Sequence, residues 1–310
     1  MSRKKTVLVV GSLNMDLVAS AERLPAKGET VFGSKFATFP GGKGANQAAA
    51  AGRLGADVQM VGCVGKDAFG AELLKSMAGS GVDIARIREV EEATGTALIT
   101  VDPAGANTIV VVGGANDLCS PEDAERAIRQ IGSDGILLLQ HEVPPETVAQ
   151  AIRSAKAQGW TVILNPAPVR SVDAELLPLI DILLPNETEM AVLAGMPAST
   201  PDAAAAAAEH LLAQGVGALI ITLGSQGALY RSQSETRHVP AYRVKAVDTT
   251  AAGDAYAGAL TAYLAEGLMM EEAMKKASAA AALSVTKSGA QPSLAWRDEV
   301  ETFLQAEGRI

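Results

Sequence analysis

Large aromatic side chains are scarce in this sequence: only 4% of its 310 residues are Phe, Trp or Tyr, while 48% are hydrophobic. The core must therefore be built mainly from Ala, Val, Leu and Ile, as in an ordinary globular protein. No apolar run reaches the roughly 18 residues that a membrane-spanning helix requires. The basic start at residues 2–5 leads into a short strand-like run rather than a signal peptide, so we predict a cytoplasmic chain.

Cysteine and positive charge are scarce as well. The two cysteines, Cys63 and Cys119, are predicted to be reduced thiols because nothing in the sequence indicates secretion. The formal net charge is −9 and the Lys and Arg residues are scattered, which argues against a nucleic-acid partner. An acidic chain can still bind a phosphorylated ligand, but it must do so with backbone amides, helix termini and a metal ion.

Several familiar catalytic signatures are also missing. The sequence contains no GxxxxGK[ST], HExxH, GxSxG or CxxC pattern, and no GxGxxG follows the first strand-like run. A P-loop, a zinc protease site, a serine-hydrolase elbow and a thiol redox site therefore have no support. A dinucleotide-dependent oxidoreductase is only a distant alternative.

Short runs rich in β-branched residues recur along the chain. They are predicted to be buried strands of a parallel sheet, at residues 7–10, 58–61, 136–139, 162–164, 182–184 and 219–221. Helix-compatible stretches lie between them, including residues 145–158, 187–194 and 201–214. This alternation predicts an α/β fold with a doubly wound, mostly parallel sheet sandwiched by helices, whose ligands bind beyond the carboxyl ends of the strands.

Two segments interrupt this alternation. Residues 17–39 contain two strand-like pieces without a helix, and two more pieces, 96–101 and 107–112, flank the turn sequence Asp102-Pro103-Ala104-Gly105. We expect the four pieces to form a small antiparallel sheet, made by residues of about 12–40 and 95–113, inserted in a single domain of residues 1–310. A lid over a ligand site and an ordinary hairpin edge are equally compatible with this spacing.

The most informative local motif is DTTAAGD, which ends at Asp254 and precedes a helix-compatible stretch. Small residues at the start of a helix leave N–H groups accessible, and the helix dipole favours an anion there. The amides of Ala251, Ala252 and Gly253 are therefore candidates for an anion hole around a transferring phosphoryl group. Asp254 either takes the proton of an attacking alcohol or only stabilises the helix N-terminus; the spacing alone does not decide.

A second motif, PGGKGANQ at residues 40–47, leads into an Ala-rich, helix-compatible stretch. Its paired glycines allow a ligand to approach the backbone, and Lys43 and Asn46 supply donors suited to hydroxyl groups. Taken alone, the motif is better explained by a turn before a capped helix.

Two further motifs follow predicted strands. Asn186 and Glu189 have the spacing of a capping box, although a carboxylate at a strand's carboxyl end can also hold Mg²⁺ together with substrate phosphates. The glycine-rich segment TLGSQG at residues 222–227 fits a nucleotide pocket and a plain turn equally well.

Taken in order, these motifs resemble those of the ribokinase branch of the PfkB carbohydrate kinase family. PGGKGANQ is similar to the N-terminal signature of that family, and DTTAAGD with its helix is similar to the C-terminal one. The segments GSLNMD at 11–16, NPAP at 165–168 and GAQPS at 289–293 extend the resemblance over nearly the whole chain. It implies a ribokinase-like fold with a β-lid and a homodimer formed through that lid.

The resemblance also implies phosphoryl transfer from ATP to a sugar, with the 5-hydroxyl of ribose as acceptor and Asp254 as general base. It assigns the sugar contacts to Asn14, Asp16, Gly42, Lys43, Asn46 and Glu142. It assigns the nucleotide pocket to Asn186, Thr222, Gly224, Ser225, Gly227, Gly253 and Ser278. At Ser278 many relatives carry Asn or His, so the contact with the base is expected to differ here.

Two cations belong to the same expectation. Mg²⁺ accompanies ATP near Glu189. A monovalent cation, typically K⁺, is held near Asp248, Thr250, Ser284, Lys287, Gly289 and Ser293, with Lys287 contributing its carbonyl. Sibling kinases acting on deoxyribose, fructose, a nucleoside or a keto-sugar acid remain alternatives, and a non-catalytic sugar-binding sensor is a more distant one.

Overall fold

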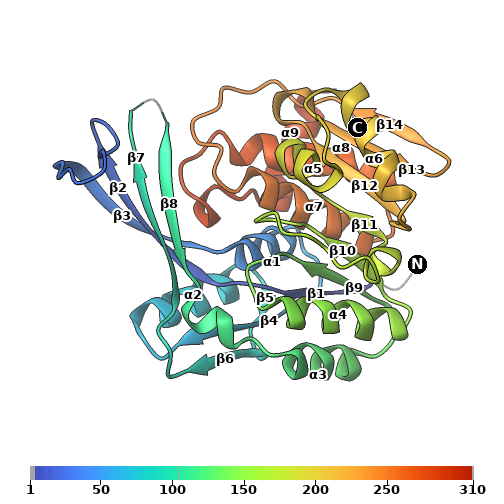
Figure 1. Ribbon diagram of the computed structural model, residues 1–310, viewed down its shortest axis with the longest axis horizontal. Coiled ribbons are helices and arrows are strands. Elements are labelled where there is room, and N and C mark those ends of the chain that lie inside the picture. Colours follow the sequence, from blue (N-terminus) through green and yellow to red (C-terminus); the bar gives the residue numbers. More distant parts are fainter. Residues whose placement is uncertain (1–3, 104, 309–310) are drawn as a thin grey trace.

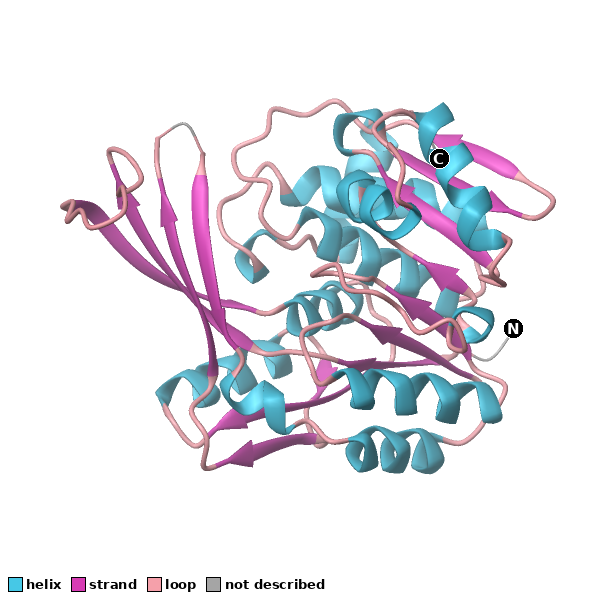
Figure 2. Cartoon of the chain, in the orientation of Figure 1, coloured by secondary structure: helices cyan, strands magenta, loops and turns pink. Residues whose placement is uncertain are grey.

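A computed structural model describes residues 4–103 and 105–308 (Figure 1). A ten-stranded sheet carries helices on both faces, and a four-stranded sheet projects from one side of it (Figure 2). Among the described residues, no helix is both long and apolar enough to cross a membrane. Cys63 and Cys119 are buried free thiols.

The main sheet confirms the mostly parallel arrangement predicted from the apolar runs. Its strands are β1 (Thr6–Val10), β4 (Val58–Gly65), β5 (Val82–Asp83), β6 (Ile87–Val90), β9 (Gly135–Leu139), β10 (Thr161–Leu164), β11 (Ile182–Leu183), β12 (Ala218–Thr222), β13 (Ala228–Ser232) and β14 (Thr236–Val239). Their order is β14-β13-β12-β11-β10-β9-β1-β4-β5, and β6 also pairs with β4. The pairs from β12 to β5 are parallel, whereas β13 and β14 add an antiparallel edge.

Helices cover this sheet in two layers. They are α1 (Lys43–Arg53), α2 (Ala68–Gly79), α3 (Pro121–Ile131), α4 (Pro145–Ala157), α5 (Glu187–Ala194), α6 (Pro201–Leu212), α7 (Ala252–Ala265), α8 (Met270–Ser284) and α9 (Arg297–Ala306), with short 3₁₀ turns η1 (Gly114–Leu118), η2 (Leu177–Leu179), η3 (Gly224–Gln226) and η4 (Gln291–Ser293). Val7 and Val9 of β1 pack in the layer of α1, α2, α7, α8 and α9, whereas Leu8 and Val10 pack in the layer of α3 to α6. Because both faces are buried, the strands read as continuous apolar runs.

The projecting sheet, hereafter the lid, contains β2 (Asn14–Ala21), β3 (Gly33–Gly41), β7 (Gly95–Val101) and β8 (Asn107–Val112), in the order β3-β2-β7-β8 (Figure 1). Its outer pairs are antiparallel as predicted, while its central pair, β2 with β7, is parallel. That pair is parallel because both strands leave the main body in the same direction, with Asn14 opposite Gly95 at the base. Ala104, in the predicted turn between β7 and β8, lies outside the described residues.

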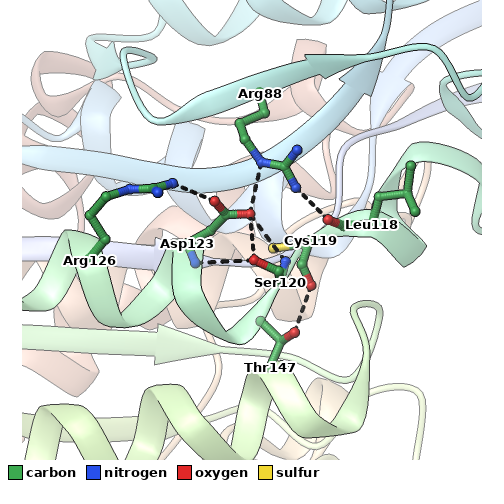
Figure 3. A network of polar contacts seen from close by, with 7 residues as sticks. All are labelled: Arg88, Leu118, Cys119, Ser120, Asp123, Arg126 and Thr147. Atoms are coloured by element: carbon green, nitrogen blue, oxygen red, sulfur yellow. Dashed lines mark hydrogen bonds and ion pairs between the residues drawn. The ribbon is translucent and has the colours of Figure 1, made fainter.

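A polar network fixes the segment that returns from the lid to the main body (Figure 3). Arg88 of β6 donates to Asp123 in the first turn of α3 at 2.8 Å and to the carbonyl of Leu118, at the end of η1, at 2.6 Å. Thr147 of α4 donates to the carbonyl of Cys119 at 2.6 Å. These bonds hold η1, and with it the base of β8, against the main body.

Helices α1 and α7 pack unusually close to each other. A Cβ atom added at Gly258 of α7 would lie 2.3 Å from the carbonyl oxygen of Gln47 and 2.7 Å from the Cβ of Ala50, both in α1. Only a residue without a side chain fits between these two backbones. The contact places the first turns of α1 and α7 side by side.

We therefore expect Gly258→Ala to lower the free energy of unfolding by about 1–3 kcal/mol, because the added methyl group must push α1 away from α7. Gly79→Ala is a matched control at the end of α2, where an added Cβ meets no heavy atom within 4 Å. Urea and thermal unfolding would measure both variants. Equal stabilities of the two would contradict the close packing.

Candidate active site

Two adjoining cavities lie beyond the carboxyl ends of the central strands. The larger has a volume of about 550 Å³ and the smaller about 160 Å³. They share lining residues after β11, at the end of β12 and at the start of α7, namely Asn186, Thr222, Thr249, Ala252 and Gly253. The site therefore lies where a doubly wound sheet is expected to bind its ligand.

The larger cavity gathers the residues that the sequence assigned to a nucleotide. All of them line it: Asn186, Thr222, Gly224, Ser225, Gly227, Gly253 and Ser278. Its remaining wall is mostly apolar and includes Tyr242, Val244 and Tyr256. A mostly apolar slot with a polar mouth suits a planar base with phosphates at one end.

Asp254 lies at the wall of the smaller cavity, with Lys43 and Glu189. Its carboxylate is buried and is held on both sides: Asn46 Nδ2 donates to Oδ2 at 2.9 Å, and Gln47 Nε2 donates to Oδ1 at 2.9 Å. Both donors come from α1, so the close contact of α1 with α7 fixes the orientation of this carboxylate.

Lys43 supplies the positive charge of the smaller cavity. The negative charge of Asp254 raises the pKa of Lys43, and burial opposes this, while Glu142, Glu189 and Asp16 raise it further. The ammonium group therefore stays protonated among these carboxylates.

The N-terminus of α7 differs in part from the predicted anion hole. Ala251 has a left-handed backbone with φ of 60°, and this turn lets the N–H of Ala252 donate to the carbonyl of Thr249 at 3.3 Å. Within the described part of the chain, the N–H groups of Ala251 and Gly253 make no hydrogen bond. Of the three candidate amides, that of Ala252 is therefore engaged in this turn, and those of Ala251 and Gly253 remain as free donors.

Asp16 of β2 carries the most perturbed carboxyl group of the site. Burial raises the pKa of Asp16 to about 7, the charges of Glu142 and Asp254 add to the rise, and Lys43 opposes it. Gly41 on the neighbouring strand leaves room for this side chain, since a Cβ there would lie 2.4 Å from Asp16 Oδ2.

Glu142 and Asn14 are each fixed by a residue that sequence reasoning did not single out for that role. Glu142 Oε2 accepts from the hydroxyl of Ser12 at 2.6 Å and from the N–H of Lys43 at 3.0 Å. Asn14 Oδ1 accepts from Asn116 Nδ2 at 2.7 Å, and Asn116 belongs to η1. The network that anchors η1 therefore reaches the predicted sugar contacts.

The glycine-rich turn before α1 completes this side. Gly42 is the N-cap of α1 with φ of 87°, and a Cβ there would meet the N of Asn14 at 2.6 Å. Among the described residues, the Oδ1 of Asn46 is buried and has no hydrogen-bond partner. A ligand hydroxyl donating to Asn46 would satisfy this acceptor, whose burial without a partner is otherwise costly.

Glu189 and Asn186 form the predicted capping box. Glu189 Oε2 accepts from the N–H of Asn186 at 2.9 Å, and Asn186 Oδ1 accepts from the N–H of Glu189 at 2.8 Å. Burial raises the pKa of Glu189, while its bond with Asn186 and the charge of Lys43 oppose the rise. Within residues 4–103 and 105–308 no group of three His, Cys, Asp or Glu side chains could hold a metal ion. One carboxylate beside a phosphate-sized cavity fits Mg²⁺ that takes its other ligands from water and phosphates.

The residues assigned to a monovalent cation come from the loop before α7 and from the segment that runs from the end of α8 to η4, and these two stretches lie side by side. Asp248 accepts from the N–H groups of Thr250 and Gly289, both at 2.9 Å. Burial raises the pKa of Asp248, but these hydrogen bonds outweigh burial and hold the pKa below its ordinary value. The carboxylate is therefore charged. The Lys287 ammonium pairs with Glu299 at 2.6 Å.

Two hydroxyl groups at the ends of the second stretch, in α8 and η4, also suit a cation. Ser284 donates to the carbonyl of Ala281 and Ser293 to that of Ala290, each at 2.8 Å. Each hydroxyl proton is thus directed at a carbonyl, which leaves the oxygen lone pairs available. A nearby carboxylate with hydroxyl and carbonyl oxygens is a donor set that fits a hard cation.

The family of this chain is shown by a match of its sequence to a family profile. The sequence profile described as pfkB family carbohydrate kinase matches residues 4–297. The chain belongs to the PfkB family of carbohydrate kinases. It is thus a phosphotransferase, as the sequence predicted.

Named relatives of this PfkB kinase span nearly its whole length. It is 40% identical over 303 residues to a ribokinase of Haemophilus influenzae, covering 97% of this chain and 99% of the other. It is 39% identical over 300 residues to a deoxyribokinase of Salmonella typhi, covering 96% and 98%.

Solved structures show the same fold. The ribokinase of Arabidopsis thaliana complexed with ribose and ATP is 36% identical to this kinase, with a TM-score of 0.89 and coverage of 98% and 99%. A putative ribokinase II of E. coli in complex with ATP and Mg²⁺ is 28% identical, with a TM-score of 0.81 and coverage of 98% and 100%. The predicted α/β fold is confirmed.

The raised pKa of Asp16 predicts that this kinase loses stability as the pH rises. The ordinary value is 3.8 and the folded value about 7. As pH rises from 4 to 7, the unfolded chain loses this proton before the folded one does, so the folded state loses stability, by at most about 4 kcal/mol above pH 7.

Asp16→Asn removes this charge, so it should raise the Tm above pH 7 and should not do so below about pH 4. The same change in the exposed Asp173 is the control and should give no pH-dependent difference. Thermal unfolding from pH 4 to 8 measures both. A constant offset between Asp16→Asn and wild type across this range would refute the electrostatic cause.

Proposed function

We propose that this kinase transfers the γ-phosphoryl group of ATP to the 5-hydroxyl of D-ribose. One observation carries the proposal: the carboxylates of Asp16 and Asp254, which are buried, and of Glu142, which is partly buried, gather beside the first turns of α1 and α7. They lie next to a cavity suited to a nucleotide. Carboxylates accept hydrogen bonds from vicinal hydroxyls, so this side suits a sugar. Relatives named ribokinase support ribose as that sugar.

The sugar side works by positioning. Asp16 and Glu142 accept from hydroxyls of the sugar, and the amide groups of Asn14 and Asn46 bind the remaining ones. Gly42 allows the ring to approach the backbone. Holding the acceptor hydroxyl in line with the phosphoryl group removes much of the entropic barrier of a bimolecular reaction.

The chemical step depends on Asp254 and the N-terminus of α7. Asp254 orients the 5-hydroxyl and takes its proton as the bond to phosphorus forms. The free amides of Ala251 and Gly253, together with the helix dipole, stabilise the negative charge on the transferred group. Mg²⁺ near Glu189 would neutralise charge on the ATP phosphates, and Lys43 adds a fixed positive charge beside the same cavity.

A monovalent cation such as K⁺ is part of the proposal. It would be held by the charged carboxylate of Asp248, the hydroxyls of Ser284 and Ser293, and backbone oxygens near Thr250, Lys287 and Gly289. Because Asp248 to Thr250 lead directly into the anion hole, a cation there would order the turn that presents Ala251.

Deoxyribose is the main alternative acceptor. The identities to the ribokinase and the deoxyribokinase, 40% and 39%, do not separate the two sugars. Two carboxylates beside Asn14 favour a sugar with several free hydroxyls, which is the reason for preferring ribose. Fructose, a nucleoside, a keto-sugar acid and a non-catalytic sensor are less well supported.

The lid is proposed to close over the sugar and to join two chains. Paired strand residues share a face, so Leu17, Leu98 and Val110 lie on the face opposite Asp16. Leu98 is 48% and Val110 60% exposed, and Phe36 and Val112 on the same face are 66% and 51% exposed. An apolar face of this kind favours a partner, and we propose a cytoplasmic homodimer of single domains, each with the lid inserted.

The acceptor is tested with a panel of ribose, deoxyribose, fructose, a nucleoside and a keto-sugar acid, with ADP release as the readout. Ribose should have the highest kcat/KM.

Asp254→Asn should lower kcat by about 10²–10⁴-fold because the base is lost. Calorimetry should show ribose still binding, and near-wild-type turnover in this variant would remove the proposed mechanism.

The lid dimer is tested by Val110→Lys, which places a charge on the exposed apolar face, on the edge strand β8. Sedimentation velocity should show the wild type as a dimer and the variant shifted toward monomer. Lys35→Glu, a charge change on the opposite lid face, serves as the control and should leave the dimer intact. A variant that stays dimeric at low micromolar concentration would place the interface elsewhere.

A further inference from the structure

The amide of Gln47 joins Asp254 to two other buried amides. Its Nε2 donates to Asp254 Oδ1 and to Asn165 Oδ1, both at 2.9 Å, and its Oε1 accepts from Gln140 Nε2 at 2.6 Å. Gln47 and Gln140 are fully buried, and Asn165 is 8% exposed. The three amides come from α1 and from the residues that follow β9 and β10.

The direction of every bond in this chain of amides follows from one backbone carbonyl. The carbonyl of Leu184 can only accept, so Asn165 directs its Nδ2 toward it, at 2.7 Å. Asn165 then presents Oδ1 to Gln47, which must donate to it, and Gln47 turns its own carbonyl toward Gln140. The second N–H of the same Gln47 amino group consequently faces Asp254, and Oδ1 of Asp254 must accept.

This arrangement makes the two oxygens of Asp254 unequal. Oδ1 is bound by Gln47, which lies in the core and has no free polar atom. Oδ2 is bound by Asn46, whose own Oδ1 is still without a partner among the described residues. Asn46 therefore still has an acceptor to offer a ligand hydroxyl beside Oδ2, whereas Gln47 has none to offer beside Oδ1.

We propose that Gln47 is a positioning residue for phosphoryl transfer: it occupies Asp254 Oδ1 and leaves Oδ2 as the oxygen that takes the proton of the sugar hydroxyl. Asn165 and Gln140 act through Gln47 by fixing the orientation of its amide. The inference rests on the proposed role of Asp254 as the base.

Gln47→Met keeps the volume of the side chain and removes its donors. In the full chain we expect kcat to fall about 10- to 100-fold, because a hydrogen bond to a charged group is lost. The KM values for ribose and ATP should change by no more than about threefold, since a loss confined to the transition state lowers kcat alone. A rise in KM at unchanged kcat would overturn the proposal.

A double variant separates positioning from a structural role. In the Asp254→Asn background, Gln47→Met should lower the residual rate no further, because both changes remove the same function. Multiplying losses would show that Gln47 acts independently of Asp254. If the Asp254→Asn single variant keeps its activity, Asp254 is not the base and the proposed function itself is wrong. If Asp254→Asn is inactive but the Gln47→Met single variant has a normal kcat, only the role of Gln47 is refuted.

Two further variants keep the test decisive. Gln59→Met, in β4 and bound to Arg86 away from the site, is the matched control and should keep its kcat. If Gln47→Met does not fold, as judged by circular dichroism and thermal unfolding, Gln140→Met removes the donor one step further out. We expect a smaller fall in kcat there, about 2- to 10-fold. An unchanged kcat in a folded Gln140→Met would contradict the proposed chain of amides.

Discussion

The close contact of α1 with α7 is the constraint on which the rest of the site depends. Because Gly258 has no side chain, the two helices approach until Asn46 and Gln47 reach the carboxylate of Asp254. The same approach places Lys43 beside that carboxylate and beside Glu142. Hydrogen bonds alone would not bring these groups together, since each needs a backbone held within a few tenths of an ångström.

The concentration of negative charge in this site lowers the stability of the folded protein. Asp16, Glu142, Asp254 and Glu189 surround one ammonium group, and the buried carboxyl of Asp16 is the one whose pKa rises to about 7. Such a cluster repels itself in the absence of ligand. It is kept in place by neighbours that donate to it, including Ser12 and the backbone N–H of Lys43, so the site is organised before a substrate arrives.

Features set by local sequence were predictable. The apolar strands were recognised because burial on both faces leaves no polar alternation, and α5 has the predicted bounds because Asn186 caps it and Gly195 ends it in a left-handed turn. The motifs around Asp254 and Lys43 stood out in the sequence because small residues before a helix have a direct chemical meaning.

Features set by distant pairing were not predictable. The parallel pairing of β2 with β7 joins segments about 80 residues apart, and the bond from Asn116 to Asn14 spans 102 residues. Nothing in the sequence around Gln140 or Asn165 indicates that their side chains bind Gln47. The N–H of Ala252 is engaged because Ala251 has a left-handed backbone, and the sequence does not predict this conformation for an alanine.

The two sides of the cleft come from separate stretches of the chain, and this division bears on how such kinases diverge. The proposed acceptor contacts run from Asn14 to Glu142, whereas the proposed ATP contacts run from Asn186 to Ser278. Substitutions in the lid strands and at the end of β9 can thus alter which sugar is accepted while the phosphate machinery stays intact. The ribokinase and the deoxyribokinase that are 40% and 39% identical to this chain are consistent with such independence.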